Sequence, residues 1–318
     1  MNILITGGAG FIGSHLCDRL LQDVPGSQIT IVDDLSLGSR ANIQHVLDSG
    51  RVSLVEGDAS DISFLRPVFE AKKIDMVFHL AANSDIAVSH ERPDVDFNRT
   101  FLTTFSLLMA MKEFGVKHIV FASTSAIYGD SNGQTIGEGY GPLFPVSHYG
   151  AAKLSSEAFI SSFVANYGIQ AWIIRFPNVV GERATHGVIF DFIRKLEASP
   201  SSLVVLGNGE QNKPYLYVKD LVDAICFIWK NTGEPINFYN VGVESRTKVK
   251  DIARILLEEM GSDAEIVYTG GDRGWIGDVP QFSYDLTKLH SIGWSARHTS
   301  DEAVRLSVRS ILDSRKQA

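Results

Sequence analysis

A tyrosine and a lysine four residues apart, Tyr149 and Lys153, are the side chains whose types and spacing most clearly suggest chemistry. Residues at this spacing share one face of a helix, so the ammonium group is expected beside the phenol. A free tyrosine has a pKa of about 10, and a neighbouring positive charge lowers it toward the range of a general base. Thr124 ends an apolar, strand-like run, and its hydroxyl is expected to bond the same substrate oxygen. Such a pair alone is common on solvated helix faces, so its meaning depends on the surrounding elements.

A glycine-rich stretch near the N-terminus is the element expected to bring a cofactor to this pair. An apolar run at 2–6 predicts a buried strand, glycines then recur at every third position, and a helical apolar pattern follows. Glycine at a strand-to-helix turn lets a pyrophosphate reach the amides of the helix N-terminus. The stretch predicts a dinucleotide site, with a purely structural glycine turn as the alternative. The expected contacts are Gly7, Gly10, Phe11, Ile12 and Gly13.

Acidic and small residues at the ends of later predicted strands fit the same cofactor. Asp33 and Asp34 follow a strand at 29–32. A carboxylate there accepts hydrogen bonds from ribose hydroxyls and repels a 2′-phosphate, which favours NAD over NADP. For Asp34 alone, a turn cap is an equal alternative. The other contacts expected at strand ends are Asp58, Ala59, Leu80, Ala81 and Ala82.

The alternation of strands and helices predicts an α/β fold. Through residue 175 the pattern predicts a Rossmann-type doubly wound parallel sheet, the NAD-binding domain at 1–175, with one long helix from 94 to 114. Shorter helices and turn-rich segments follow at 176–318, which we interpret as a smaller C-terminal α/β substrate lobe. A strand near 237–241 is a candidate to rejoin the main sheet.

The composition is that of an ordinary globular enzyme. The chain has 318 residues, 44 % of them apolar, and a net charge of −8, which argues against a general nucleic-acid or membrane-surface binder. No run of about eighteen apolar residues occurs, and a first strand beginning at residue 2 leaves no room for a signal peptide. Cys17 and Cys226 are expected to be core thiols. We expect a cytoplasmic protein, and no metal site is assigned.

Several motifs together resemble the extended short-chain dehydrogenase/reductase family, and within it the nucleotide-sugar epimerases of the UDP-glucose 4-epimerase type. The resemblance runs nearly end to end. It rests on motifs at 6–14, 79–82, 149–153, 175–181, 207–211, 217–220 and 277–279.

The resemblance implies roles for particular residues. NAD would stay tightly bound, Tyr149 and Thr124 would act on the sugar 4-hydroxyl, and Lys153 would hold the nicotinamide ribose. Asn178 would contact the substrate phosphates. Further substrate contacts implied by the resemblance are Ser125, Val188, Val204, Lys213, Tyr215 and Arg273.

The chain departs from the family pattern at three places. Thr100 stands where the family usually has an asparagine near the cofactor, and Pro177 replaces a common Phe or Tyr. Both residues are expected to contact the cofactor. Lys213-Pro214-Tyr215 stands where many relatives have Arg-Asp-Phe. Lysine keeps the charge for a phosphate but loses the bidentate fork, so the nucleotide is expected to be held differently.

The two residues after Thr124 separate the possible reactions. Sugar 4,6-dehydratases of this family carry Asp-Glu there, and decarboxylases tend to carry a Glu, whereas this chain has Ser125 and Ala126. Neither can act as acid or base, so transient oxidation and hydride return at C4 is favoured. The alternatives are another NAD-dependent nucleotide-sugar enzyme, such as a dehydratase or decarboxylase, and a non-catalytic NAD-binding regulator. The regulator is disfavoured because Tyr149 and Lys153 are both kept.

Two aromatic stripes predict a homodimer. A helix with apolar residues on more than one face must bury more than one face. We expect two such helices to pair with their mates as a four-helix bundle, with cover by the C-terminal lobe as the alternative. The stripes are Phe97, Phe101 and Phe105, and Phe159, Phe163 and Tyr167.

Overall fold

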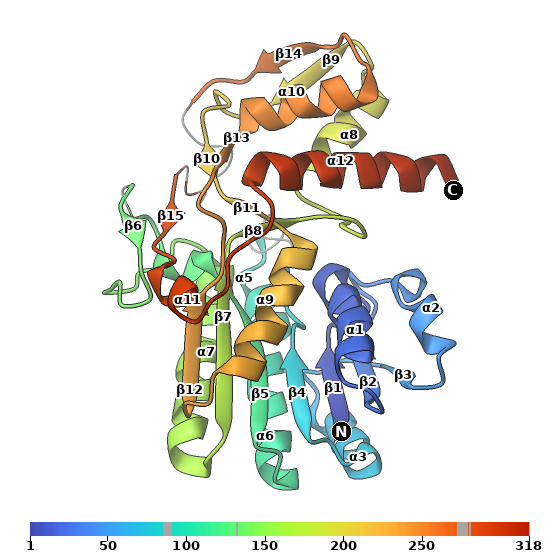
Figure 1. Ribbon diagram of the computed structural model, residues 1–318, viewed down its shortest axis with the longest axis vertical. Helices are drawn as coiled ribbons and strands as arrows, with labels where there is room; N and C mark the ends of the chain where they lie inside the picture. Colours follow the sequence, from blue (N-terminus) through green and yellow to red (C-terminus); the bar gives the residue numbers. More distant parts are fainter. Residues whose placement is uncertain (85–90, 132, 272–278, 280, 318) are drawn as a thin grey trace. The chain divides into compact units, whose positions relative to one another are not determined.

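The structure, a computed structural model, describes residues 1–84, 91–131, 133–271, 279 and 281–317. None of the helices in these ranges combines the length and the apolar character needed to cross a membrane. The chain forms two compact units, whose elements Figure 1 labels. Unit 1 comprises 1–128, 143–175 and 222–239, and Unit 2 comprises 129–142, 176–221 and 240–318. The chain therefore crosses between the two units several times, whereas a single boundary at residue 175 would give one crossing.

Unit 1 is built on a seven-stranded sheet with the strand order β3-β2-β1-β4-β5-β7-β12. Neighbouring strands from β3 to β5 pair in parallel. Ile3 lies beside Ile29 and Ile5 beside Ile31, all buried, as expected for a sheet covered on both faces. The predicted doubly wound fold is confirmed, and the strand expected near 237–241 is the edge strand β12. The strands are β1 (Asn2–Thr6), β2 (Gln28–Asp33), β3 (Val52–Glu56), β4 (Met76–His79), β5 (His118–Thr124), β7 (Gln170–Phe176) and β12 (Ile236–Asn240).

The helices around this sheet differ from expectation in one place. The single helix predicted at 94–114 is divided into α5 (Pro93–Asp96), the π-helix η2 (Phe97–Leu102) and α6 (Thr103–Phe114). A π-helix turn bonds residues five apart, so it changes which side chains face the sheet. The other helices are α1 (Phe11–Asp23), η1 (Arg40–Asn42), α2 (Gln44–Leu47), α3 (Ile62–Lys72), η3 (Ser125–Tyr128), α7 (His148–Tyr167) and α9 (Val218–Asn231).

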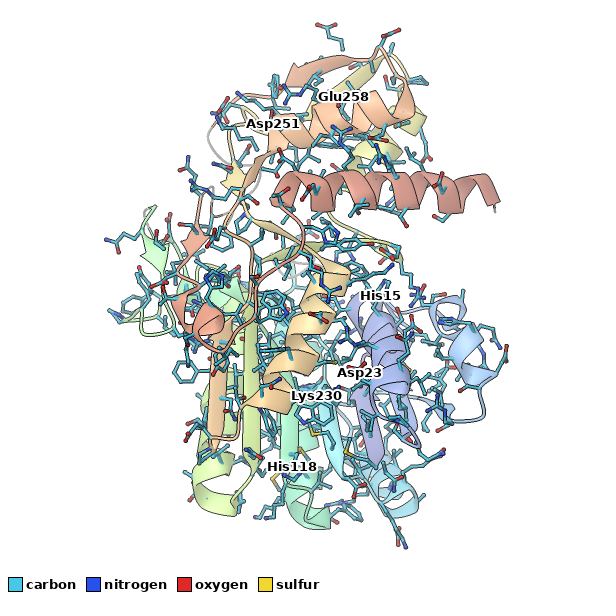
Figure 2. All side chains as sticks on the ribbon, in the orientation of Figure 1. His15, Asp23, His118, Lys230, Asp251 and Glu258 are labelled. Carbon is cyan, nitrogen blue, oxygen red and sulfur yellow. The ribbon has the colours of Figure 1, made fainter. Side chains whose placement is uncertain are left out.

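Ion pairs join α1 to α9, although two hundred residues separate them in sequence. Lys230 Nζ lies 2.8 Å from Asp23 Oδ2, and Figure 2 labels both residues. Arg19 bonds Asp23 at 2.9 Å and Asp223 at 2.8 Å. Beneath them the Trp229 ring meets Phe78 of β4 edge-on, with 5.4 Å between the ring centroids. The late helix α9 thus covers the early strands of the sheet.

In the residues of Unit 2 that the structure describes, four small strand pairs and four helices are found. β8 pairs in parallel with β11, β9 with β14 and β6 with β15, and β10 pairs antiparallel with β13. Arg305 and Arg309 of α12 bond Glu259 of α10 at 2.6 and 2.7 Å. The strands are β6 (Thr135–Ile136), β8 (Asn178–Val180), β9 (Ser202–Val205), β10 (Asn212–Lys213), β11 (Tyr215–Tyr217), β13 (Thr247–Lys248), β14 (Glu265–Tyr268) and β15 (Ser283–Tyr284). The helices are α8 (Val188–Ala198), α10 (Val249–Met260), α11 (Thr287–Ser291) and α12 (Ser300–Gln317).

Candidate active site

The glycine turn brings three segments of backbone into contact at the carboxyl end of β1. A Cβ on Gly13 would lie 2.2 Å from the Gly7 carbonyl oxygen, so only glycine lets α1 start this close to the strand. Gly7 has φ +71°, and a Cβ there would lie 2.7 Å from the Ala81 nitrogen. The segment after β4 therefore touches the turn. This is the point where the strand order reverses, which is where open α/β sheets bind ligands.

The N-terminus of α1 has no side-chain cap, which leaves it open to a pyrophosphate. Gly10 precedes the helix, no side chain caps it by a hydrogen bond, and its first turn carries no acid. Amides at a helix start that lack a side-chain partner form a ready anion site. The glycine turn and the start of α1 therefore fit a dinucleotide. Contact of the cofactor with Gly10, Phe11 and Ile12 stays a prediction.

Asp33 lies at the end of β2 beside this turn. Its Oδ2 accepts a hydrogen bond from Ala9 N and its Oδ1 accepts one from Leu35 N, both at 2.9 Å. The backbone N–H of Gly10 is a further donor to this carboxylate. A carboxylate has about four acceptor sites, so about one stays open for a ribose hydroxyl. Burial raises the pKa of Asp33, and its backbone hydrogen bonds oppose that shift.

The other two acids predicted at strand ends both form local turns. Asp34 accepts hydrogen bonds from the backbone N and the hydroxyl of Ser36 at 2.9 and 2.6 Å, which fits the alternative of a turn cap. Asp58 is exposed and accepts from Ser60 N at 2.8 Å. Ala59 beside it is buried, with 6 % of its surface exposed.

The predicted catalytic residues lie together in Unit 1. Tyr149 and Lys153 are on the first turns of α7, and the Thr124 hydroxyl at the end of β5 is hydrogen-bonded to the Tyr149 phenol. The α7 helix is held against this strand end because Ser147 caps it and because Gly150 packs tightly. A Cβ on Gly150 would lie 2.5 Å from the Ala126 carbonyl oxygen.

Lys153 is buried below the tyrosine, with 2 % of its surface exposed. Its Nζ donates to the Ala122 carbonyl oxygen at 2.6 Å and lies 5.9 Å from the centre of the Tyr149 ring. Burial lowers the pKa of Lys153 to about 7, while the charges of Glu157 and Asp96 oppose the shift. The lysine is thus a cation whose proton is easily lost.

The pKa of Tyr149 moves in the direction opposite to the one expected. Burial of the phenol and the negative charge of Asp96 raise it, and the hydrogen bond with Thr124 lowers it only in part. The expectation that Lys153 brings the tyrosine pKa down is therefore wrong for the protein chain by itself. The ammonium group is held by Ala122, and Asp96 was absent from that expectation.

A buried ion pair supports α7 one turn beyond Lys153. Arg175 of β7 donates to both oxygens of Glu157, the shorter bond being 2.6 Å, and to the Tyr128 hydroxyl at 2.9 Å. The Ser123 hydroxyl also donates to Glu157, at 2.5 Å. Glu157 lies four residues after Lys153, so its place on the same helix face was a usable signal that the sequence interpretation missed.

A neutral histidine links the sheet to the helices of the site. His79 is fully buried, its Nδ1 lies 2.6 Å from Thr6 Oγ1, and its Nε2 lies 2.9 Å from Thr104 Oγ1. Ser156 of α7 continues this chain by donating to Thr104 Oγ1 at 3.0 Å. Burial and the charge of Lys153 lower the pKa of His79 to about 3. Its role is therefore hydrogen bonding in the neutral form.

Thr100 is buried in η2 and is hydrogen-bonded to the loop after β4. Its hydroxyl accepts a hydrogen bond from Asn83 N at 3.1 Å, and its carbonyl oxygen accepts one from Thr104 Oγ1 at 3.0 Å. Leu80, Ala81 and Ala82 precede Asn83 and are half-buried. Thr100 thus positions the segment on which contact with the cofactor was predicted.

The residues predicted to hold the substrate nucleotide belong to Unit 2. Asn178 is exposed on β8 and stands in register with the buried Tyr215 of β11. Lys213 of β10 is buried, whereas Val204 of β9 keeps 38 % of its surface exposed. Val188 begins α8, Pro177 is buried before β8, and Arg273 lies outside the described residues. Their contacts with a substrate stay predictions.

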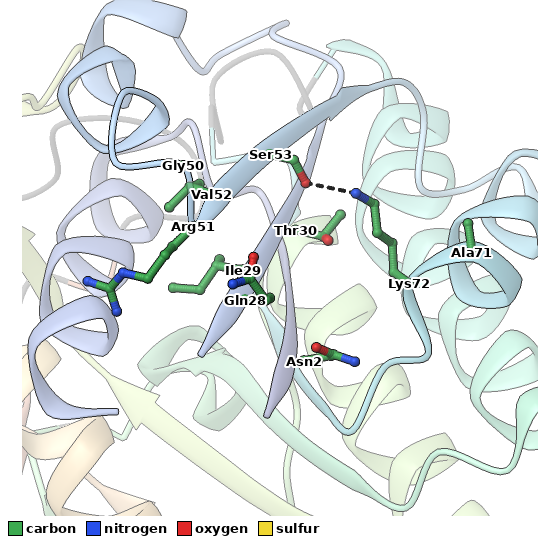
Figure 3. A pocket seen from close by; sticks show the side chains of 10 residues that line it. All are labelled: Asn2, Gln28, Ile29, Thr30, Gly50, Arg51, Val52, Ser53, Ala71 and Lys72. Atoms are coloured by element: carbon green, nitrogen blue, oxygen red, sulfur yellow. Dashed lines mark hydrogen bonds between the residues drawn. The ribbon is translucent and has the colours of Figure 1, made fainter. Parts of the chain in front are cut away.

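The cavity drawn in Figure 3 lies at the other end of the Unit 1 strands. Its volume is about 320 Å³, and it contains none of the predicted site residues. Ser53 accepts a hydrogen bond from Lys72 Nζ there at 3.2 Å. It is lined by Asn2, Gln28, Ile29, Thr30, Gly50, Arg51, Val52, Ser53, Ala71 and Lys72. We do not place the reaction there, because these are the amino ends of β1, β2 and β3.

Comparison with known proteins fits this geometry. Residues 3–242 match the model of the NAD dependent epimerase/dehydratase family. A putative UDP-glucose 4-epimerase of Methanocaldococcus jannaschii is 32 % identical over 95 % of this chain and 96 % of its own. A crystal structure of a UDP-galactose 4-epimerase is 37 % identical over 99 % of both chains, with a TM-score of 0.87.

A dehydratase is also similar in structure. The dTDP-glucose 4,6-dehydratase DesIV of Streptomyces venezuelae, solved with NAD bound, is 26 % identical over 100 % of this chain and 98 % of its own, with a TM-score of 0.90. Epimerases and dehydratases thus both match nearly the whole chain. The chain belongs to the NAD dependent epimerase/dehydratase family, and its cofactor is NAD.

Proposed function

We propose that this protein is a nucleotide-sugar 4-epimerase of the UDP-glucose/UDP-galactose type. The observation that carries the proposal is the Tyr149 phenol, hydrogen-bonded to Thr124 above a buried Lys153, with no acid at the two positions that follow Thr124. The names of the epimerase relatives support the UDP-hexose class.

The side chains supply proton transfer and orientation. Tyr149 as phenolate takes the proton of the sugar 4-hydroxyl while the C4–H bond breaks, and it returns the proton when the bond reforms on the opposite face. Thr124 orients the same oxygen, and Lys153, whose Nζ lies 5.9 Å from the centre of the Tyr149 ring, is assigned by family resemblance to hold the nicotinamide ribose. NAD, when bound, takes up the hydride and gives it back, so the reaction consumes no net oxidant.

The dehydratase is the main alternative, since such an enzyme matches nearly the whole chain. Elimination of water across C5 and C6 requires an acid and a base, and neither Ser125 nor Ala126 offers an ionisable group. Ser125 and Ala126 open the short helix η3, and Ala126 N donates to Thr124 Oγ1 at 3.2 Å. A non-catalytic regulator is disfavoured because the tyrosine, lysine and threonine are all present.

A substrate panel tests this proposal. Purified protein is incubated with UDP-, GDP- and dTDP-hexoses, and the products are identified by NMR spectroscopy. We expect the 4-epimer of at least one UDP-hexose, with its 6-hydroxyl retained. A 4-keto-6-deoxy sugar would refute the epimerase proposal, and the absence of turnover across the panel would favour the regulator.

Unit 2 is proposed to hold the nucleotide. Asn178 and Tyr215 stand on paired strands, and Lys213 supplies a positive charge from the neighbouring β10. The exposed apolar side chain of Val204 suits the face of a base. Val188 and Arg273 are assigned to the same role by family resemblance alone. A lysine in place of arginine offers a single charge rather than a fork, so we expect weaker discrimination among phosphate positions.

We also propose that the protein forms a two-fold dimer through η2, α6 and α7. The two predicted aromatic stripes lie against each other, since the Phe159 ring is 5.2 Å from Phe101 and 5.5 Å from Phe105. Their outer members stay accessible, with Phe97 56 % and Phe159 39 % exposed. An exposed aromatic face of this kind is typical of a contact surface, and a mate could cover it as an isologous interface.

A further inference from the structure

Three ionisable groups, Glu157, His79 and Asp96, act on the Tyr149–Lys153 pair. They differ in whether a bonded cation neutralises them. The Glu157 carboxylate is neutralised by Arg175, which donates to both of its oxygens. His79 is neutral, as its low pKa requires. Among the described residues that face the pair, this leaves Asp96 as the acid without a cation bonded to it.

Asp96 is buried at the end of α5, with 1 % of its surface exposed. Its Oδ1 accepts a hydrogen bond from Asn83 Nδ2 at 3.0 Å. Its Oδ2 is buried and has no hydrogen-bond partner within the part of the chain that the structure describes. A buried carboxylate with an unused oxygen destabilises a fold. Holding the loop at Asn83 needs only an acceptor, so the negative charge itself requires another explanation.

We propose that Asp96 is a positioning residue whose buried negative charge is balanced by Lys153 and holds a proton on the Tyr149–Lys153 pair. The inference rests on the proposed roles of Tyr149 and Lys153. Helix α5, which ends at Asp96, packs against α7, which carries Tyr149 and Lys153. The charge of Asp96 raises the pKa of the phenol and of the ammonium group alike.

The chemical consequence concerns the strength of the base. Two ionisable groups that interact strongly titrate as a pair, and a negative charge facing both raises the proton affinity of the pair as a whole. A pair with high proton affinity draws the proton from a sugar hydroxyl more strongly once its own proton has left. Asp96 would thus strengthen the base without touching the substrate.

The substitution Asp96→Asn removes the charge but keeps an oxygen that can accept from Asn83 Nδ2. Asp94→Asn is the matched control, since Asp94 lies on the same helix and is exposed. Phenolate formation is followed by ultraviolet absorbance in NAD-loaded protein without sugar. Subtracting the same titration in the matching Tyr149→Phe protein isolates Tyr149.

We expect Asp96→Asn to form the Tyr149 phenolate at a pH lower by about one unit, and the acid limb of kcat/KM to move the same way. Asp94→Asn should titrate like the wild type. If Asp96→Asn also titrates like the wild type, the carboxylate only anchors Asn83 and the proposal is overturned.

A second measurement tests the proposal even if Asp96→Asn does not fold. Asp96→Glu keeps the negative charge, so it should form the Tyr149 phenolate at the same pH as the wild type. A folded Asp96→Glu protein that forms the phenolate about one pH unit lower would show that the charge is not the cause, which overturns the proposal. The phenolate titrations need no sugar, so a failed substrate panel would reject the epimerase function while leaving this test of Asp96 intact.

Discussion

The Tyr149 phenol is held in a setting that favours its neutral form. It is bonded to Thr124, it faces the Asp96 carboxylate, and the nearest ammonium group, that of Lys153, is hydrogen-bonded elsewhere. A phenol shielded from water in this way is a weak acid, and its conjugate base is correspondingly strong. Once its own proton has passed to solvent, the phenolate can take a proton from a sugar alcohol and return it in the same turnover.

Tyr149→Phe removes the hydroxyl that this chemistry requires while leaving the ring in place. We expect a loss of roughly 10²–10⁴-fold in turnover, with the fold and the bound NAD retained. Tyr167→Phe is the control, since Tyr167 lies at the far end of α7 and is 37 % exposed. Product formation and the NAD released on denaturation are the measurements. Near wild-type turnover in Tyr149→Phe would show that another group deprotonates the sugar.

His79 predicts a pH-dependent stability. Its pKa is 6.5 in the unfolded chain and about 3 in the folded protein. Between these two pH values His79 is protonated in the unfolded state but neutral in the folded state. The contribution of neutral His79 to the free energy of unfolding is therefore full above pH 6.5 and is lost as the pH falls toward 3. The loss reaches about 1.4 kcal/mol per pH unit.

His79→Asn lacks this ionisable group, so its stability should fall less in acid. Urea unfolding of both proteins at neutral pH and at about pH 5 measures the effect. We expect the stability advantage of the wild type over the variant to shrink at the lower pH. An advantage that does not change with pH would contradict the neutral, buried histidine.

The catalytic residues could be predicted where their relation is local. Tyr149 and Lys153 are one helical turn apart, and Thr124 ends an apolar run, so spacing alone pointed to them. Asp96 gave no signal, because its burial depends on the packing of α5 against α7. The direction of the Tyr149 pKa was missed for the same reason, since it depends on a charge brought there by folding.

At the scale of elements, the start of α1 is fixed by close backbone packing at the glycine turn. Gly13→Ala would place a methyl group 2.2 Å from the Gly7 carbonyl oxygen. Relieving this clash would require the backbone to move, because the oxygen is a backbone atom. We expect a loss of more than about 2 kcal/mol in the free energy of unfolding, together with weaker NAD binding. Denaturant unfolding and NAD titration measure both quantities.

Gly233→Ala is the control for this prediction. A Cβ there would meet nothing within 4 Å, so stability should stay the same or rise by about 0.4–1 kcal/mol. Equal effects of the two substitutions would contradict a special role for Gly13.

The strands were easier to predict than the helix that precedes β5. The core strands are mainly apolar, as in Ile3–Ile5 of β1 and Met76–Phe78 of β4, which is typical of buried parallel strands. The residues 94–114 have helical periodicity throughout, yet η2 interrupts the α-helix. Periodicity averages over several turns and is insensitive to one wider turn. Thr100 lies in that turn, so its contact with Asn83 could not be derived from spacing.

At the scale of the whole molecule, the exposed aromatic face predicts the dimer. Phe97→Ser should weaken it, and sedimentation at micromolar concentration should show a shift toward monomer. Phe144→Ser is the control, since Phe144 is 72 % exposed and lies outside the two stripes. A monomeric wild type would exclude the dimer, and an equal effect of both substitutions would place the interface elsewhere.

The order of the strands also has a consequence for synthesis on the ribosome. The edge strand β12 is made only at residues 236–240, long after β7, whose Ala171 N donates to the Pro235 carbonyl oxygen at 2.9 Å. Until then a nascent chain exposes the open edge of β7 and the Phe78 ring that Trp229 later covers. An unpaired apolar edge invites aggregation. We therefore expect a fragment ending at residue 175 to depend on chaperones during translation, and the complete chain to be released from them only after β12 has emerged.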